Sequence, residues 1–211
     1  MHEKSIAILG KGPSVARCTK EFIDSFDEVA ICGRPIFDGY EEIIGRRAHW
    51  DFANESAVRY SPEMKERLGN PLWINTDDES PYRKEFTEEY SGWFADWFEW
   101  GPSTGTFAFD WFVKNPEYTK IALIGFDLFP KGESLYYFKR EEWNPNMEYL
   151  FHNGTFSEDG RMLIDSLHDT KMTYKYMNEM FNTYKDKQFY IITDYPFEER
   201  DNLKIMEEIY Y

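Results

Sequence analysis

The stretch Ile6-Ala7-Ile8-Leu9-Gly10-Lys11-Gly12-Pro13-Ser14 joins an apolar run to a glycine turn, and a more polar segment follows it. This order predicts a strand that leads into a turn at a helix start, where glycine accepts a positive φ and Pro13 suits the first helical turn. Unpaired amides at a helix start attract phosphate, so the turn favours a nucleotide or another phosphorylated ligand. A glycine turn also serves purely steric needs, and this one lacks the full dinucleotide or Walker spacing, so both interpretations stay open.

Short apolar runs rich in β-branched residues recur between amphipathic stretches along the chain. This alternation predicts an α/β fold with a mainly parallel, twisted sheet flanked by helices on both faces. We expect strands at 5–9, 28–32, 48–52, 71–74, 120–125 and 188–193, and helices at 15–25, 36–44, 62–68, 104–114, 172–184 and 197–208. The length of 211 residues suits one domain over 1–211. Within it, the segment 129–168 lacks sustained periodicity and is predicted to be a long loop or lid.

The charge balance limits the classes of binding partner. The chain has 24 basic and 39 acidic side chains, a formal net charge of −15, which disfavours a nucleic acid or an anionic membrane surface as the main partner. Cys18 and Cys32 form no disulfide framework and belong to no zinc-type cluster, which favours a reducing compartment. No apolar run approaches 20 residues, so we expect a cytoplasmic protein without a transmembrane segment; peripheral attachment to a membrane stays an alternative.

In open α/β sheets, ligands bind beyond the carboxyl ends of the strands. The residues expected there are 10–14, Gly33-Arg34-Pro35, Ala53-Asn54, Asn75-Thr76 and Gly125-Phe126-Asp127. A second helix start stands out at Ser103-Thr104-Gly105, where Ser103 or Thr104 suits the N-cap. The cap is either ordinary capping chemistry or a place for a ribose or phosphate. Asp127 could orient a loop amide or face the ligand, and we favour the structural role.

Four stretches, in order, resemble bacterial sialyltransferases of glycosyltransferase family 42. Gly10-Lys11-Gly12-Pro13-Ser14 is similar to the family's Gly-Asn-Gly-Pro-Ser turn, and Ile31-Cys32-Gly33-Arg34-Pro35 to its Arg-Cys-Asn-Gln segment. Ser103-Thr104-Gly105 is similar to the family's Thr-Ser-Gly. The later segment Gly125-Phe126-Asp127-Leu128-Phe129 is similar to its Gly-Ile-Asp-Phe-Tyr. His168 lies where the family has its catalytic histidine.

The resemblance implies a single Rossmann-like domain of the GT-A-variant type and transfer of a sugar from a CMP-activated donor, such as CMP-sialic acid, to a glycan hydroxyl with inversion. His168 would be the general base. Tyr136 and Tyr137 would stabilise the departing phosphate. The implied donor-nucleotide residues are Gly10, Lys11, Gly12, Ser14, Gly33, Arg34, Asn54, Ser103, Thr104, Gly105 and Phe129. His49 and His152 are rival bases.

The chain departs from the family pattern at three donor positions. Lys11 and Gly33 stand where asparagines are expected, and Phe129 lacks the hydroxyl of the corresponding tyrosine. Lys11 or Arg34 could pair with phosphate, or either could be a solvated surface charge.

No Asp-x-Asp triplet occurs, so no metal site is indicated and no cofactor is required, although Asp77-Asp78 could bind a divalent cation. The alternatives are a protein related to pterin pyrophosphokinases or flagellin-glycosylation factors and a catalytically inactive nucleotide-binding module. Relatives are often oligomers, which leaves a homo-oligomer open.

Overall fold

The computed structural model describes residues 3–33, 37–54, 71–75, 102–128 and 170–207. These residues form one seven-stranded sheet in the order β4-β3-β2-β1-β5-β6-β7, in which every neighbouring pair is parallel. The strands are β1 (Lys4–Leu9), β2 (Glu28–Cys32), β3 (Trp50–Asn54), β4 (Pro71–Asn75), β5 (Tyr118–Ile124), β6 (Gln188–Ile192) and β7 (Leu203–Ile205). The predicted Rossmann-like α/β fold with a parallel sheet is confirmed.

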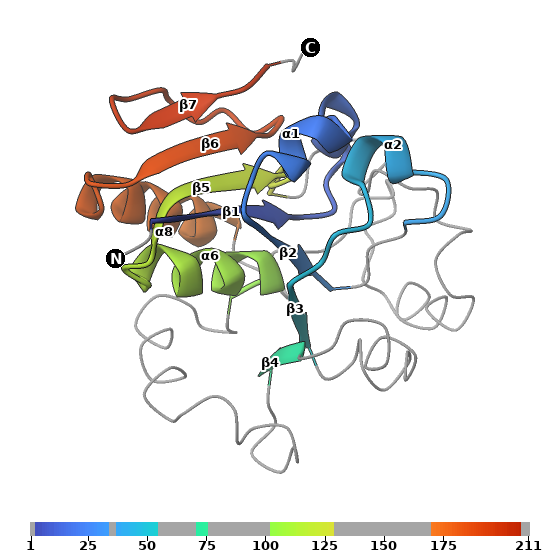
Figure 1. Ribbon diagram of the computed structural model, residues 1–211. Coiled ribbons are helices and arrows are strands. Elements are labelled where there is room, and N and C mark those ends of the chain that lie inside the picture. Colours follow the sequence, from blue (N-terminus) through green and yellow to red (C-terminus); the bar gives the residue numbers. More distant parts are fainter. Residues whose placement is uncertain (1–2, 34–36, 55–70, 76–101, 129–169, 208–211) are drawn as a thin grey trace, which may run out of the picture.

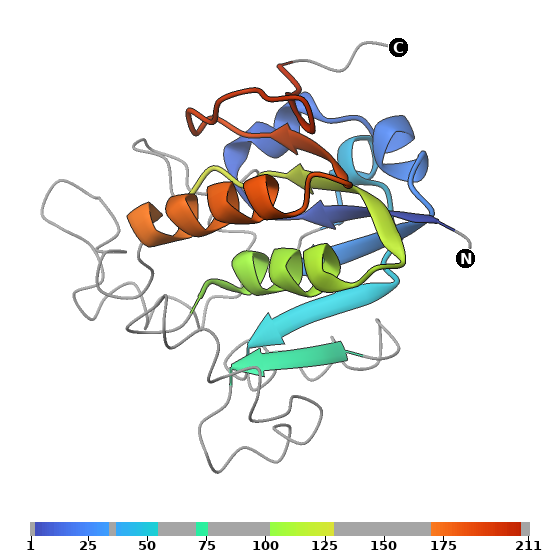
Figure 2. The ribbon, with the colours of Figure 1, turned by 90° about the vertical axis from the view of Figure 1, so that its left-hand side faces the viewer.

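Helices cover both faces of the sheet. They are the 3-10 helix η1 (Pro13–Arg17) and the α-helices α1 (Lys20–Asp24), α2 (Glu41–Ile44), α6 (Thr104–Lys114) and α8 (Thr170–Thr183). Figure 1 shows the strands fanning from β4 at the bottom to β7 at the top. Figure 2 shows α6 and α8 side by side on one face, with α1 and α2 on the other. Among the described residues, none of these helices combines the length and apolarity that a bilayer crossing needs.

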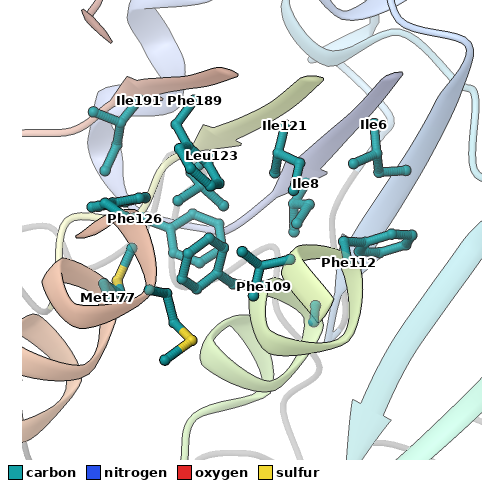
Figure 3. Packing of buried hydrophobic residues seen from close by; sticks show 14 of the residues in the cluster. Ile6, Ile8, Phe109, Phe112, Ile121, Leu123, Phe126, Met177, Phe189 and Ile191 are labelled. Atoms are coloured by element: carbon teal, nitrogen blue, oxygen red, sulfur yellow. The ribbon is translucent and has the colours of Figure 1, made fainter. Parts of the chain in front are cut away.

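The alternation of side chains along β1 divides the core into two layers. Ile6 and Ile8 pack toward α6 and α8, and Ala7 and Leu9 pack toward η1, α1 and α2. Figure 3 shows Ile6, Ile8, Ile121 and Leu123 directed from the strands toward Phe109 and Phe112 of α6. A parallel sheet covered on both faces requires apolar residues at successive positions, which explains the continuous apolar runs of β1, β2 and β5.

Two predicted helices are shorter than expected. The stretch 15–25 divides into η1 and α1 because Cys18, with φ −87° and ψ 161°, is extended, and Thr19 then caps α1 by accepting a hydrogen bond from the Phe22 amide. In the described part of the stretch 36–44, residues 37–44, the helix is limited to the four residues of α2, which ends at Gly45 with φ 64°. The predicted helix 62–68 and lid 129–168 lie outside the described residues.

The prediction of a helix over 197–208 is wrong, because strand β7 lies within this range. Leu203 is fully buried and pairs with Phe189 of β6, so the chain extends the sheet instead of coiling against it. Before the strand, the backbones of Arg200 and Leu203 exchange two hydrogen bonds, and the Ile205 amide donates to the Glu199 carboxylate. Hydrogen bonding to β6 outweighs the amphipathic pattern of this segment.

Candidate functional site

The change of direction in strand order occurs between β1 and β5, which are neighbours at the centre of the sheet (Figure 1). After β1 the chain proceeds to β2 on one side, and after β5 it proceeds to β6 on the other side. A crevice forms beyond the carboxyl ends of two such strands because their connections leave in opposite directions, and α/β proteins bind ligands there. The turns after β1 and β5 are therefore the centre of the candidate site.

Asp127 holds these turns together. Its Oδ2 accepts a hydrogen bond from the Ser14 amide at 2.8 Å, and its Oδ1 accepts one from the Asp194 amide, beyond β6, at 2.7 Å. The residue is 2% exposed. Hydrogen bonds that a carboxylate accepts from amides are stronger than neutral ones. Asp127 thus orients two loop amides, as the sequence predicts, and it joins the ends of β1, β5 and β6.

Two glycines allow the turns to approach this closely. A Cβ at Gly12 would lie 2.2 Å from Oδ2 of Asp127. Gly125 has φ 74°, in the left-handed region, and a Cβ there would lie 2.4 Å from Cγ2 of Val15. The glycine turn therefore has a steric purpose, which was one of its two interpretations from the sequence.

The first turn of η1 does not supply the free amides expected for a phosphate. The Gly12 amide donates to the Gly125 carbonyl at 3.0 Å, Ser14 donates to Asp127, and Val15 donates to the Gly12 carbonyl at 3.1 Å. Pro13 has no N–H to offer. A ligand at this turn would have to use other groups, such as the Lys11 side chain.

The start of α6 is better placed to meet an anion. Ser103 is the N-cap, because its Oγ accepts a hydrogen bond from the Thr106 amide at 3.3 Å. The amides of Thr104 and Gly105, at the first two helical positions, make no hydrogen bond to any other residue in the described part of the chain. The partial positive charge of an eleven-residue helix is concentrated at these amides.

The start of α6 also adjoins the turn after β5. A Cβ at Gly105 would lie 3.1 Å from the ring of Phe126. The cap of α6 and the turns after β1 and β5 therefore meet at one edge of the sheet.

A charged cluster lies beside the turn after β1. The Lys11 ammonium reaches the end of β2, where a Cβ at Gly33 would lie 2.8 Å from its Nζ. Asp51 of β3 is 1% exposed, and its Oδ1 has no hydrogen-bond partner among the described residues. Burial raises the pKa of Asp51 to about 7, and the positive charge of Lys11 opposes that rise. Burial and the Asp51 charge also raise the pKa of the Cys32 thiol, which keeps it protonated.

The remaining predicted site residues are partly outside this description. Gly10 follows β1 and donates its amide to the Ile124 carbonyl, and the backbone of Asn54 ends β3 in register with Asn75. Arg34, Phe129, Tyr136, Tyr137 and His168 lie outside the described residues, as does the rival base His152.

His49 lies away from the candidate site. It precedes β3, and its Nδ1 accepts a hydrogen bond from the Val29 amide near the start of β2, so it is at the opposite end of the sheet. Among the described residues, no group of three or more His, Cys, Asp and Glu side chains is arranged to hold a metal ion.

Solved structures share this architecture. The sialyltransferase CstII from Campylobacter jejuni, in complex with cytidine 5′-monophosphate, aligns with a TM-score of 0.57 and 15% identity over 92% of this chain and 81% of its own. CstII with a trisaccharide acceptor and CMP aligns with a TM-score of 0.58, and monomeric CstII with 0.59; each is 15% identical over 90% of this chain and 81% of its own. The chain has a sialyltransferase-like fold. No protein-family model and no curated protein sequence matches it.

Two parts of the candidate site are not singled out by the sequence predictions. Thr193 and Asp194 directly follow β6, so the rule used for the other strand ends would have found them. Asp51 is flanked by Trp50 and Phe52 within a strand, and a carboxylate inside a doubly covered sheet has to be buried. The position of Asp51 within an apolar strand therefore indicated a buried carboxylate. Its proximity to Lys11 could not be predicted, because the two residues are far apart in the sequence.

Replacement of Asp127 by asparagine tests the bridge between the turns. Asp127→Asn should lower the free energy of unfolding by about 1–3 kcal/mol, because an amide group presents an N–H to one of two backbone donors. Hydrogen exchange should accelerate selectively at the Ser14 and Asp194 amides. The exposed residue Asp186, at the turn between α8 and β6, provides a control of equal charge change, and Asp186→Asn should leave both amides protected. Unchanged protection in Asp127→Asn contradicts the bridge.

Replacement of Asp51 by asparagine tests the buried carboxyl through the pH dependence of stability. A pKa of about 7 in the folded state exceeds the ordinary value of 3.8, so folding favours the protonated acid. The contribution of the protonated Asp51 carboxyl to the free energy of unfolding is complete below about pH 4 and is lost as the pH rises through 7. Asp51→Asn should therefore gain stability relative to the wild type by about 3 kcal/mol between pH 5 and pH 8, measured by urea unfolding. Equal pH dependence in the two proteins contradicts a buried titrating carboxyl.

Proposed function

We propose that the chain is a sialyltransferase-like glycosyltransferase that transfers sialic acid or a related keto sugar from a CMP-activated donor to a glycan hydroxyl. The observation that carries this proposal is the convergence of the resembling stretches. Gly12 meets Asp127, Gly105 meets Phe126, and Gly33 meets Lys11, all at the carboxyl edge of the sheet. The first of these stretches and the stretch that contains Asp127 are far apart in the chain, with Ser14 and Asp127 separated by 113 positions, so their convergence is a property of the fold.

In this proposal the nucleotide lies against the start of α6. The amides of Thr104 and Gly105 are available to a phosphate or ribose oxygen, and the Ser103 cap keeps the helix start in place. The ammonium of Lys11 supplies positive charge from the turn after β1. The fold similarity to CstII, whose structures contain CMP, supports a cytidine nucleotide as the ligand.

The chemistry rests on residues outside the described part of the chain. His168 would accept the proton of the acceptor hydroxyl as that oxygen attacks the anomeric carbon from the side opposite CMP, which inverts the configuration. Tyr136 and Tyr137 would donate hydrogen bonds to the phosphate of CMP as its bond to the sugar breaks. Arg34, Asn54 and Phe129 would complete the donor contacts. A monophosphate leaving group develops less charge than a diphosphate, so this reaction makes little demand on a metal ion.

A ligand panel tests the nucleotide class. CMP and CDP should raise the thermal unfolding midpoint more than UMP, UDP, GDP and AMP at equal concentration, because a ligand that binds the folded state stabilises it by mass action. Cytidine and uridine differ only at the 4-substituent and the adjacent N3, where donor and acceptor are exchanged, so they form the matched pair. A preference for a purine nucleotide contradicts the proposal. Transfer of pyrophosphate from ATP to a pterin would assign the chain to the alternative class.

Replacement of His168 tests the proposed base. His168→Ala should reduce the rate of sugar transfer at least about 100-fold while CMP affinity changes less than about twofold, because a general base acts on the acceptor hydroxyl and not on the nucleotide. His49→Ala is the matched control and should retain transfer activity. Wild-type rates in His168→Ala, or an equal loss in His49→Ala, contradict the assignment. Binding of CMP without turnover in the wild type identifies a nucleotide-binding module instead.

A further inference from the structure

The environment of Lys11 differs from that of a solvated surface lysine. Its side chain is half-buried, and the ammonium lies over Gly33, within the space that a larger residue at that position would occupy. A Cβ alone would approach Nζ to 2.8 Å. Two of the three departures from the family pattern, a lysine in the first turn and a glycine after β2, are therefore one arrangement: the glycine makes room for the ammonium.

Asp51 lies close enough to this ammonium for the charge of Lys11 to act on its carboxyl group. In the strand register Asp51 pairs with Ile31, and Ile31 pairs with Leu9, the last residue of β1. Leu9 and Ile31 belong to the core layer under η1, α1 and α2, so the side chain of Asp51 enters that layer at the carboxyl end of β1. It is 1% exposed and Oδ1 has no hydrogen-bond partner among the described residues, so its ionised form depends on nearby positive charge.

Lys11 supplies that charge, and within the described part of the chain the other neighbouring groups do not. On β2, Cys32 is a neutral thiol, and β4 contains no titratable side chain. Asp110 of α6, on the other face, pairs with Lys114 and accepts a hydrogen bond from Tyr176. The charged groups of the elements on the Asp51 face are paired with one another or exposed: Arg17 with Asp194, Lys20 and Arg47 with Asp24, Arg46 with Glu41, and Glu21 and Glu42 at the surface.

We propose that Lys11 and Asp51 form a proton-coupled anion subsite, in which a phosphate binds at the Lys11 ammonium and Asp51 takes up a proton from solvent when it does. The inference deepens the proposed function and rests on it for the identity of the anion, the phosphate of a cytidine nucleotide. An anion beside Lys11 offsets the positive charge that keeps Asp51 ionised. The two effects are linked. The factor by which a bound anion favours protonation of Asp51 equals the factor by which protonation of Asp51 raises the affinity for the anion.

The coupling is centred near neutral pH. Burial raises the pKa of Asp51 to about 7 while Lys11 opposes the rise, so an anion that offsets the Lys11 charge moves the pKa of Asp51 further upward. If the pKa rises by about one unit, the affinity for CMP falls about tenfold between the low-pH and high-pH limits. Cytidine has no phosphate and should bind without this dependence. Asp51 is a positioning residue in this account, because it acts through the charge of Lys11.

Titration calorimetry of the full chain at pH 7 tests the coupling. The heat of CMP binding, measured in phosphate-free buffers of different ionisation enthalpy, gives the number of protons taken up. The wild type should take up about 0.4 proton more than Asp51→Asn. Protons taken up by CMP itself are common to both proteins and cancel in this difference. Asp186→Asn, which removes an exposed charge, should match the wild type. Cytidine should give equal uptake in the wild type and Asp51→Asn.

A second variant keeps the proposal testable if Asp51→Asn does not fold. Lys11→Met should abolish the extra proton uptake and reduce the preference for CMP over cytidine at least about tenfold. Absence of CMP binding in the wild type contradicts the proposed function and removes the basis of the inference. CMP binding with equal proton uptake in the wild type and Asp51→Asn, or with full uptake in Lys11→Met, contradicts the inference and leaves the proposed function intact.

Discussion

The arrangement of the candidate site depends on one carboxylate. Asp127 accepts hydrogen bonds from the amides of Ser14 and Asp194, which belong to turns that follow different strands. The Thr193 hydroxyl adds a third link by donating to the Phe126 carbonyl at 2.7 Å. A ligand site between loops requires a fixed geometry, since small displacements of contact groups lower affinity and rate. Here the geometry is set by hydrogen bonds among the loops, before any ligand arrives.

The fold was predictable from the sequence because both layers of the core are encoded locally. Alternate residues of β1 supply the two faces, and the same pattern recurs in β2 and β5. Helix α6 was predicted with its observed bounds, because Ser103 is a strong cap and residues 107–113 are apolar except for Asp110. The prediction that was wrong in kind, the helix over 197–208, failed for a physical reason. The segment that contains β7 has a helical pattern, but pairing with β6 satisfies its backbone and buries Leu203, and that partner is not visible in local sequence.

The candidate site was predictable in its positions and less so in its chemistry. The rule that ligands lie beyond strand ends identified Gly12, Gly33 and Asp127, which the structure brings to one edge of the sheet. The same rule did not indicate that amides of the first turn would donate hydrogen bonds to Gly125 and Asp127. The electrostatic relation between Lys11 and Asp51 also depends on strand register, because three successive strands have to align before the carboxyl lies level with the end of β1.

The last strand of the sheet has a further consequence for the behaviour of the molecule in solution. Most peptide groups of β7 that face away from β6 have partners within the chain: Leu203 bonds with Arg200 through both of its backbone groups, and the Ile205 amide bonds with Glu199. An exposed edge with open peptide groups is a template onto which another chain can add and polymerise. By folding its preceding loop back along this border, the protein leaves fewer open peptide groups at the β7 edge for another chain to pair with.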